Sequence, residues 1–136
     1  MIKLSKLTDY AVIVLGYLSS QAGKPVSASQ VSQAVGLPEP TVQKVLKLMS
    51  SKKLITAQRG ANGGYLLPLS LSCISVYDVV EAIEGPLELA PCENNSDNDC
   101  ELSRLFSPQQ RWNKVNLAIK GTLDEIRVSE LVKVVS

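Results

Sequence analysis

Residues 27–49, SASQVSQAVGLPEPTVQKVLKLM, predict two short helices joined by a tight turn. Ser27 and Gln30 have the spacing of a capping box, and Gly36 suits the left-handed end of the first helix. Pro40 is favoured in the first turn of the second helix. Apolar side chains recur at helical spacing in that second helix, which predicts its buried face: Val42, Val45, Leu46 and Met49. Two helices in this arrangement are typical of a helix-turn-helix.

The chain on either side of this unit completes a winged helix. Upstream, apolar side chains recur at helical spacing over residues 8–20 and predict a first helix. Downstream, residues 54–58 and 65–69 are two strand-like runs, and the glycine-rich turn between them suits the tip of a hairpin. Ser75 then caps a fourth helix over residues 76–84. A two-stranded hairpin that directly follows the second helix of a helix-turn-helix is a wing.

The C-terminal part of the chain has a different character. Residues 86–107 are acidic, turn-forming and poor in apolar side chains, which predicts a loop organised around something other than a hydrophobic core. Ser107 and Pro108 open a long helix with an apolar seam: Trp112, Val115, Ile119, Thr122, Leu123 and Ile126. That spacing suits pairing with a partner helix, although packing on the chain's own domain gives the same pattern.

These patterns divide the chain into three parts. Residues 1–85 form a winged helix-turn-helix, residues 86–107 a cysteine-bearing sensor loop, and residues 108–136 a dimerisation helix and tail. The fold class is therefore mainly α with a small β-wing. We expect a homodimer through the long helix, because an exposed apolar stripe is costly for a soluble monomer.

Composition narrows the function. The chain has 136 residues, three cysteines and no histidine. Lack of histidine removes the commonest general base and, with no phosphate-binding glycine loop, argues against an enzyme. No stretch is long and apolar enough to cross a bilayer, no signal peptide opens the chain, and so few cysteines favour a reducing cytoplasm.

The charges are distributed unevenly along the chain. Residues 1–72 carry eight basic and two acidic side chains, a balance of +6, whereas residues 73–136 carry six basic and eleven acidic ones, a balance of −5. The N-terminal half therefore suits a polyanion. On the second helix and the wing the candidate DNA-binding residues are Thr41, Gln43, Lys44, Lys47, Arg59 and Gly60. Gln43 suits a base edge in the major groove, the lysines suit phosphates, and Arg59 suits the minor groove.

Several stretches together resemble the Rrf-type winged-helix regulators. They are LSKLTDYAV at residues 4–12, GLPEPTV at 36–42, RGANGGY at 59–65 and DVVEAIEG at 78–85. The family includes the iron–sulfur-assembly and nitric-oxide-responsive repressors, and the resemblance is strongest to the regulators of the SUF iron–sulfur assembly system. It implies double-stranded DNA with a pseudo-palindromic operator as the partner, a homodimer joined by the long helix, and an iron–sulfur cluster in the loop.

The resemblance also suggests ligands for the cluster. Cys92 and Cys100 match the first two cysteine positions of the family, but the third position is occupied by Phe106, which cannot bind iron. The fourth ligand in some members is an aspartate at the start of the first helix, and Asp9 matches it; in others it is a histidine, near whose place this chain has Gln109. Two thiolates in an acidic loop remain a credible metal or redox site.

Two further expectations follow from the sequence. Cys73 lies outside the family motif and is expected to be a small buried apolar residue. The leading function is a DNA-binding regulator that responds to iron–sulfur or redox status. The alternative is a thiol-switch or metal-binding interaction protein that uses its winged helix to bind another protein.

Overall fold

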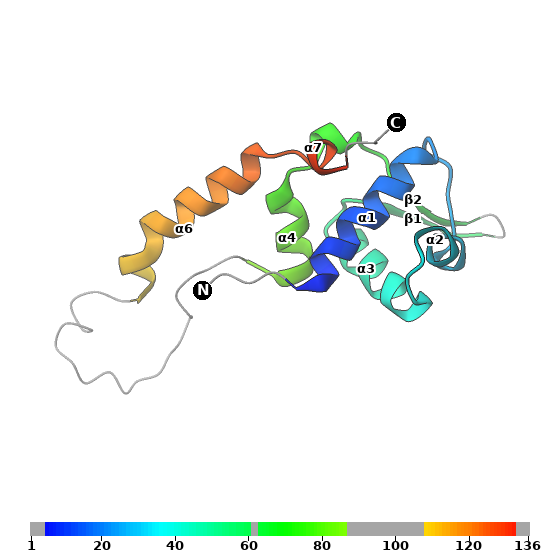
Figure 1. Cartoon of the computed structure of the whole chain (residues 1–136), viewed down its shortest axis with the longest axis horizontal. Helices are drawn as coiled ribbons and strands as arrows, with labels where there is room; N and C mark the ends of the chain where they lie inside the picture. Colours follow the sequence, from blue (N-terminus) through cyan, green and yellow to red (C-terminus); the bar gives the residue numbers. More distant parts are fainter. Residues whose placement is uncertain (1–4, 61–62, 87–107, 133–136) are drawn as a thin grey trace.

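The computed structural model describes residues 5–60, 63–86 and 108–132. Its elements follow in the order α1 (Lys6–Ser20), α2 (Ala28–Val35), α3 (Glu39–Ser51), β1 (Thr56–Gln58), β2 (Gly64–Leu66), the 3₁₀ turn η1 (Leu71–Cys73), α4 (Val76–Glu84), α6 (Pro108–Glu125) and α7 (Val128–Leu131). The first four helices and the hairpin gather into one body, and α6 extends from it as an arm (Figure 1). The predicted fold class, a mainly α winged helix with a long C-terminal helix, is confirmed.

The core lies between α1, α3 and α4. The inward-facing side chains of α3 are all fully buried, and so are those of α1 to within 1% of their surface: Val42, Val45, Leu46 and Met49, and Ala11, Val14, Leu15 and Leu18. The four residues of α3 are those that its helical spacing predicted to be buried. Burial of each large aliphatic side chain contributes about 1.5–3 kcal/mol to stability, so this cluster fixes how α3 sits on the body.

Local capping sets the ends of the helices as predicted. The Ser27 hydroxyl accepts a hydrogen bond of 3.1 Å from the Gln30 amide, and the Gln30 side chain accepts one of 2.8 Å from the Ser27 amide. Gly36 ends α2 with φ 74° and ψ 28°, in the left-handed region where glycine carries no steric penalty. The turn between α2 and α3 therefore has a fixed geometry.

The wing is shorter than the sequence predicted. β1 and β2 pair antiparallel, with Thr56 opposite Leu66, but Leu54 and Ile55 are buried in the core instead of forming the start of a strand. The cause is a turn just after α3, where Lys53 has a φ of 64° and directs the chain inward. At its base the wing joins the body through Val26, whose amide donates to the Tyr65 carbonyl at 2.9 Å and whose carbonyl accepts from the Tyr65 amide at 2.7 Å.

The segment after α6 folds back onto the body. The Ile126 carbonyl accepts a hydrogen bond of 2.8 Å from the Val76 amide, and the Val128 amide donates one of 2.8 Å to the Ile74 carbonyl. Val128 is fully buried. These contacts anchor the C-terminal end of α6 next to the start of α4, an arrangement to which the sequence patterns gave no signal.

Part of the predicted sensor loop lies outside the described residues, including Cys92, Cys100 and Phe106. Among the helices that the structure describes, none has the length and apolar character needed to cross a membrane.

Candidate nucleic-acid interface

The exposed face of α3 carries the residues expected to contact DNA. Gln43, Lys44 and Lys47 are exposed and Thr41 is half-buried, while the opposite face of the same helix forms the core. A helix with one buried face and one polar, basic face fits the major groove of DNA. The structure therefore brings these four side chains together on one surface.

Glu39 is a member of this surface that sequence reasoning missed. The Gln43 side-chain amide donates a hydrogen bond to the Glu39 carboxylate at 3.4 Å, across one turn of α3. This long, exposed contact joins the amide of Gln43 to the first residue of the helix. The four-residue spacing of the two side chains was the signal that could have indicated it.

The wing places Arg59 and Gly60 at its tip, where both are exposed. Gly60 has φ 122° and its carbonyl accepts a hydrogen bond of 2.9 Å from the Gly63 amide. A side chain at Gly63 would collide with the Gln58 carbonyl, so the tight return of the hairpin needs glycine there. Arg59 is therefore exposed next to a turn whose return depends on glycine.

The start of α1 carries the candidate ligand Asp9, which is exposed in the first turn of the helix. Just beside it, Glu84 at the end of α4 binds the same turn with one carboxylate oxygen. That oxygen accepts hydrogen bonds from the Ser5 amide at 2.7 Å, the Ser5 hydroxyl at 2.6 Å and the Thr8 hydroxyl at 2.6 Å. These bonds, chiefly that from the Ser5 side chain, lower the pKa of Glu84, so the carboxylate stays charged and holds α1 to α4.

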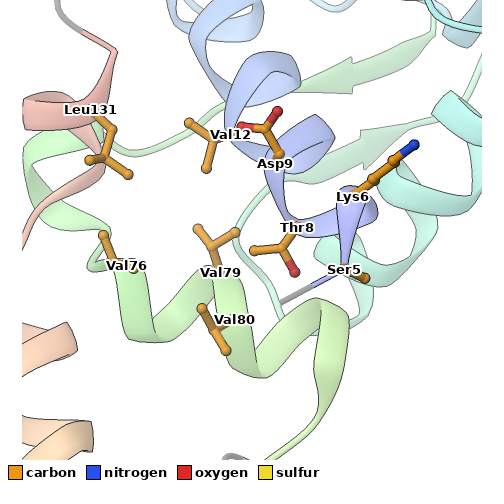
Figure 2. A pocket seen from close by; sticks show the side chains of 9 residues that line it. All are labelled: Ser5, Lys6, Thr8, Asp9, Val12, Val76, Val79, Val80 and Leu131. Atoms are coloured by element: carbon orange, nitrogen blue, oxygen red, sulfur yellow. The ribbon is translucent and has the colours of Figure 1, made fainter. Parts of the chain in front are cut away.

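A pocket of about 360 Å³ opens beside Asp9, between α1, α4 and α7 (Figure 2). Its wall is apolar and consists of Val12, Val76, Val79, Val80 and Leu131, while Lys6 and Asp9 stand at its polar edge. The pocket lies on the side of the body that carries the first turn of α1.

The described residues of one chain do not form a metal site by themselves. Nowhere in the described ranges do three histidine, cysteine, aspartate or glutamate side chains come close enough to hold an ion. Asp9 is accessible, as a ligand must be, but the thiols expected beside it lie outside these ranges. Two thiolates and one carboxylate fit iron chemically and leave one position of a four-ligand site open.

Cys73 differs from the expectation. The structure places it at the end of η1 with its thiol free and exposed, so the prediction of a buried residue was wrong. In that short turn Leu71, two positions earlier, is the residue buried against the core.

Comparison with known proteins assigns the chain to a family. Residues 4–134 match the Rrf2 family, described as iron-dependent transcriptional regulators. The chain belongs to the Rrf2 family. Protein aau3 of Rhizobium meliloti (strain 1021) is 30% identical over 131 residues, which cover 96% of this chain and 85% of that protein.

Two solved structures of regulators are similar over nearly the whole chain. CymR (YrzC), the global cysteine regulator of B. subtilis, has a TM-score of 0.66 and 25% identity, and the match covers 97% of both chains. IscR of T. potens has a TM-score of 0.63 and 27% identity, covering 97% of this chain and 87% of that one. The Rrf2 protein described here is accordingly a transcriptional regulator with a DNA-binding winged helix, and not an enzyme, as the sequence predicted.

Proposed function

We propose that this Rrf2 protein is a homodimeric cytoplasmic repressor of genes for iron–sulfur cluster assembly or redox response, and that it binds a pseudo-palindromic operator in double-stranded DNA. The observation that carries the proposal is the exposed face of α3, with Gln43 beside basic side chains and a wing that presents Arg59. The resemblance of the whole sequence to regulators of the SUF system supports genes of iron–sulfur cluster assembly as the targets.

Each residue has a separate role in this proposal. Gln43, held by Glu39, contacts a base edge in the major groove, and Thr41 contacts a base or a phosphate. Lys44 and Lys47 neutralise phosphates. At the wing, Arg59 enters the minor groove, and Gly60 allows the tip to approach the DNA backbone closely.

The test is selection of binding sites from a pool of randomised duplexes, followed by affinity measurements over a range of salt concentrations. Lys44→Ala weakens binding to all sites alike and reduces the salt slope by about 1, whereas Gln43→Ala relaxes base preference by about 1–3 kcal/mol. Lys120→Ala removes a lysine that lies on α6 over the Tyr77 ring and serves as the control. Absence of any salt-sensitive binding to DNA would overturn the proposal and favour an interaction protein.

For the sensor, we propose that Cys92 and Cys100 bind an iron–sulfur cluster together with Asp9 from the first helix of the second copy. Such a cluster would supply a response to iron supply or oxidation. The support is the family's iron dependence, the preference of iron for thiolates, and the accessibility of Asp9. Because Phe106 leaves one position without a protein thiolate, we expect the cluster to be labile in air.

Anaerobic reconstitution with iron and sulfide, followed by absorbance spectra and iron analysis, tests the sensor separately from DNA binding. Phe106→Cys increases cluster occupancy and resistance to oxygen, and Asp9→Ala bleaches the absorbance of the parent cluster. If the parent binds no iron, the sensor proposal fails. The protein is then a cluster-free DNA-binding dimer whose loop is either a vestige of a sensor or a thiol switch.

A further inference from the structure

Glu39 is a single acidic side chain within the basic stretch that contains α2, α3 and the wing. From Tyr10 to Tyr77 the sequence contains six basic residues and only this one acidic residue. Glu39 begins α3, on the same surface as Gln43, and it is exposed. Phosphates repel a carboxylate, so on a surface that binds DNA this side chain suits a base edge and not the backbone.

Glu39 also lies at the end of α3 that is expected to meet the bases. Glu39, Gln43 and Lys47 follow one another at four-residue steps and form one exposed ridge of the helix. In a helix-turn-helix, the N-terminal residues of the second helix contact base edges. Lys47 lies about 12 Å further along the helix axis. The ridge therefore changes from acidic at the end that meets the bases to basic away from it.

The hydrogen bond between Glu39 and Gln43 determines which atoms of the amide are left for a base. A carboxylate only accepts hydrogen bonds, so the amide atom that lies 3.4 Å from the Glu39 carboxylate is the nitrogen of Gln43. One N–H of that nitrogen points to Glu39, which leaves the second N–H and the carbonyl oxygen. These two groups are the donor and the acceptor that a bidentate contact with adenine requires.

The carboxylate of Glu39 discriminates between bases by its charge. In the major groove guanine presents two acceptors, N7 and O6, which repel a carboxylate, whereas cytosine presents the donor N4 amino group. Only one of the two carboxylate oxygens is bonded to Gln43, so the other is left to accept a hydrogen bond from a base. Cytosine is the base that this acceptor suits best.

We propose that Glu39 is a specificity-determining residue of the DNA-binding surface. Its carboxylate accepts a hydrogen bond from the N4 amino group of a cytosine and orients the amide of Gln43 toward a nearby adenine. This inference rests on the proposed DNA-binding function and specifies part of the sequence that the protein reads.

Selection of sites from randomised duplexes by the parent and by Glu39→Gln tests this inference. The parent selects a cytosine at one position of each half-site, and Glu39→Gln lowers that preference about tenfold, because an amide accepts donors and acceptors alike. The preference for adenine at the position read by Gln43 also falls, since no charge then fixes the orientation of its amide. Glu39→Gln binds DNA of unrelated sequence more tightly than the parent, because one repulsion of phosphates is lost.

Two further variants serve as controls. Glu125→Gln removes an exposed carboxylate from α6, gives the same change in net charge and leaves the base preferences unchanged. In the double variant that combines Glu39→Gln with Gln43→Ala, the preference for adenine falls no further than in Gln43→Ala alone, because Glu39 acts on that base through Gln43. Fully additive losses would overturn the orienting role.

A carboxylate at the first position of a helix also interacts favourably with the helix dipole. That role alone predicts that Glu39→Gln is less stable to denaturant but keeps the base preferences of the parent, a result that would overturn the inference. A parent that binds DNA in a salt-sensitive way but selects no cytosine overturns only the role of Glu39. A parent without salt-sensitive binding overturns the proposed function itself.

Discussion

Two features at Gly64 require glycine: its positive φ angle and the close approach of the Val26 backbone. Its φ is 155°, and a side chain there would collide with the Val26 carbonyl, which is bonded to Tyr65 at the base of the wing. We expect Gly64→Ala to lower the free energy of unfolding by about 3 kcal/mol and to impair DNA binding by displacing the wing.

Gly23→Ala is the control for this prediction. Gly23 also has a positive φ, 81°, but nothing lies within 4 Å of the place where its side chain would be. Its substitution therefore costs about 1 kcal/mol, the conformational part alone. Denaturant unfolding of both variants measures the difference, and equal losses would contradict the collision at Val26.

Glu84 makes the stability of the protein depend on pH. Hydrogen bonds from Ser5 and Thr8 lower the pKa of its carboxyl below the ordinary value of 4.5. The stabilisation is therefore fully present above that ordinary pKa and is lost as the pH falls through the lower pKa of the folded state. Because Glu84 is exposed and solvent screens its charge, Glu84→Gln is destabilised by only about 0.5 kcal/mol at neutral pH. The difference from the parent disappears in strong acid.

Denaturant unfolding over a range of pH measures this effect. Glu125→Gln removes an exposed carboxylate from α6 and controls for the change in net charge. A difference between the parent and Glu84→Gln that stays constant from neutral to acidic pH would show that the charge of the carboxylate is not what holds α1 to α4.

At the scale of elements, the capping boxes that begin α2 (Ser27 with Gln30) and α4 (Ser75 with Asp78) predict different losses of stability. Ser75 is fully buried and accepts a hydrogen bond of 3.0 Å from the Asp78 amide, so its removal leaves a shielded amide without a partner. Ser27 is only half-buried, and water can replace its hydroxyl. We expect Ser75→Ala to cost about 2 kcal/mol and Ser27→Ala about 1 kcal/mol, measured by denaturant unfolding; a larger loss at Ser27 would contradict this argument.

The helices could be predicted because their signals are local. Ser27, Gly36 and Ser75 act on residues within a few positions of themselves, and the buried face of α3 follows from its period alone. The same period predicted that Gln43 and Lys44 are exposed. That these side chains contact DNA is still a prediction.

Other features depend on contacts between distant segments, which the sequence patterns do not show. Leu54 and Ile55 have the composition of a strand, but the turn at Lys53 directs them into the core. Val128 is buried because Arg127 pairs with Ser75 in an isolated antiparallel bridge. Cys73 is exposed because the neighbouring core positions are filled by Leu71 and Ile74.

At the scale of the whole molecule, the basic half of the sequence is also the half that contains the proposed DNA-binding elements. The half of the sequence with a balance of +6 contains α3 and the wing, whereas the half with a balance of −5 contains α4, α6 and α7. The dimerisation surface proposed for α6 therefore lies in the acidic half, where it does not compete with DNA.

The anchoring of α6 gives the last prediction. Ile126 and Val128, directly after α6, are hydrogen-bonded to the body of the protein. We therefore expect the two α3 helices of the proposed dimer to have a fixed separation. The two half-sites of the operator must then lie on one face of the DNA, at a distance that matches the separation of the two α3 helices. Insertion of half a helical turn, about 5 base pairs, between the half-sites rotates one of them away and reduces affinity to that of a single half-site. A titration of duplexes with graded insertions measures this effect. Affinity that does not change with the spacing would show that the two winged helices bind DNA independently of each other.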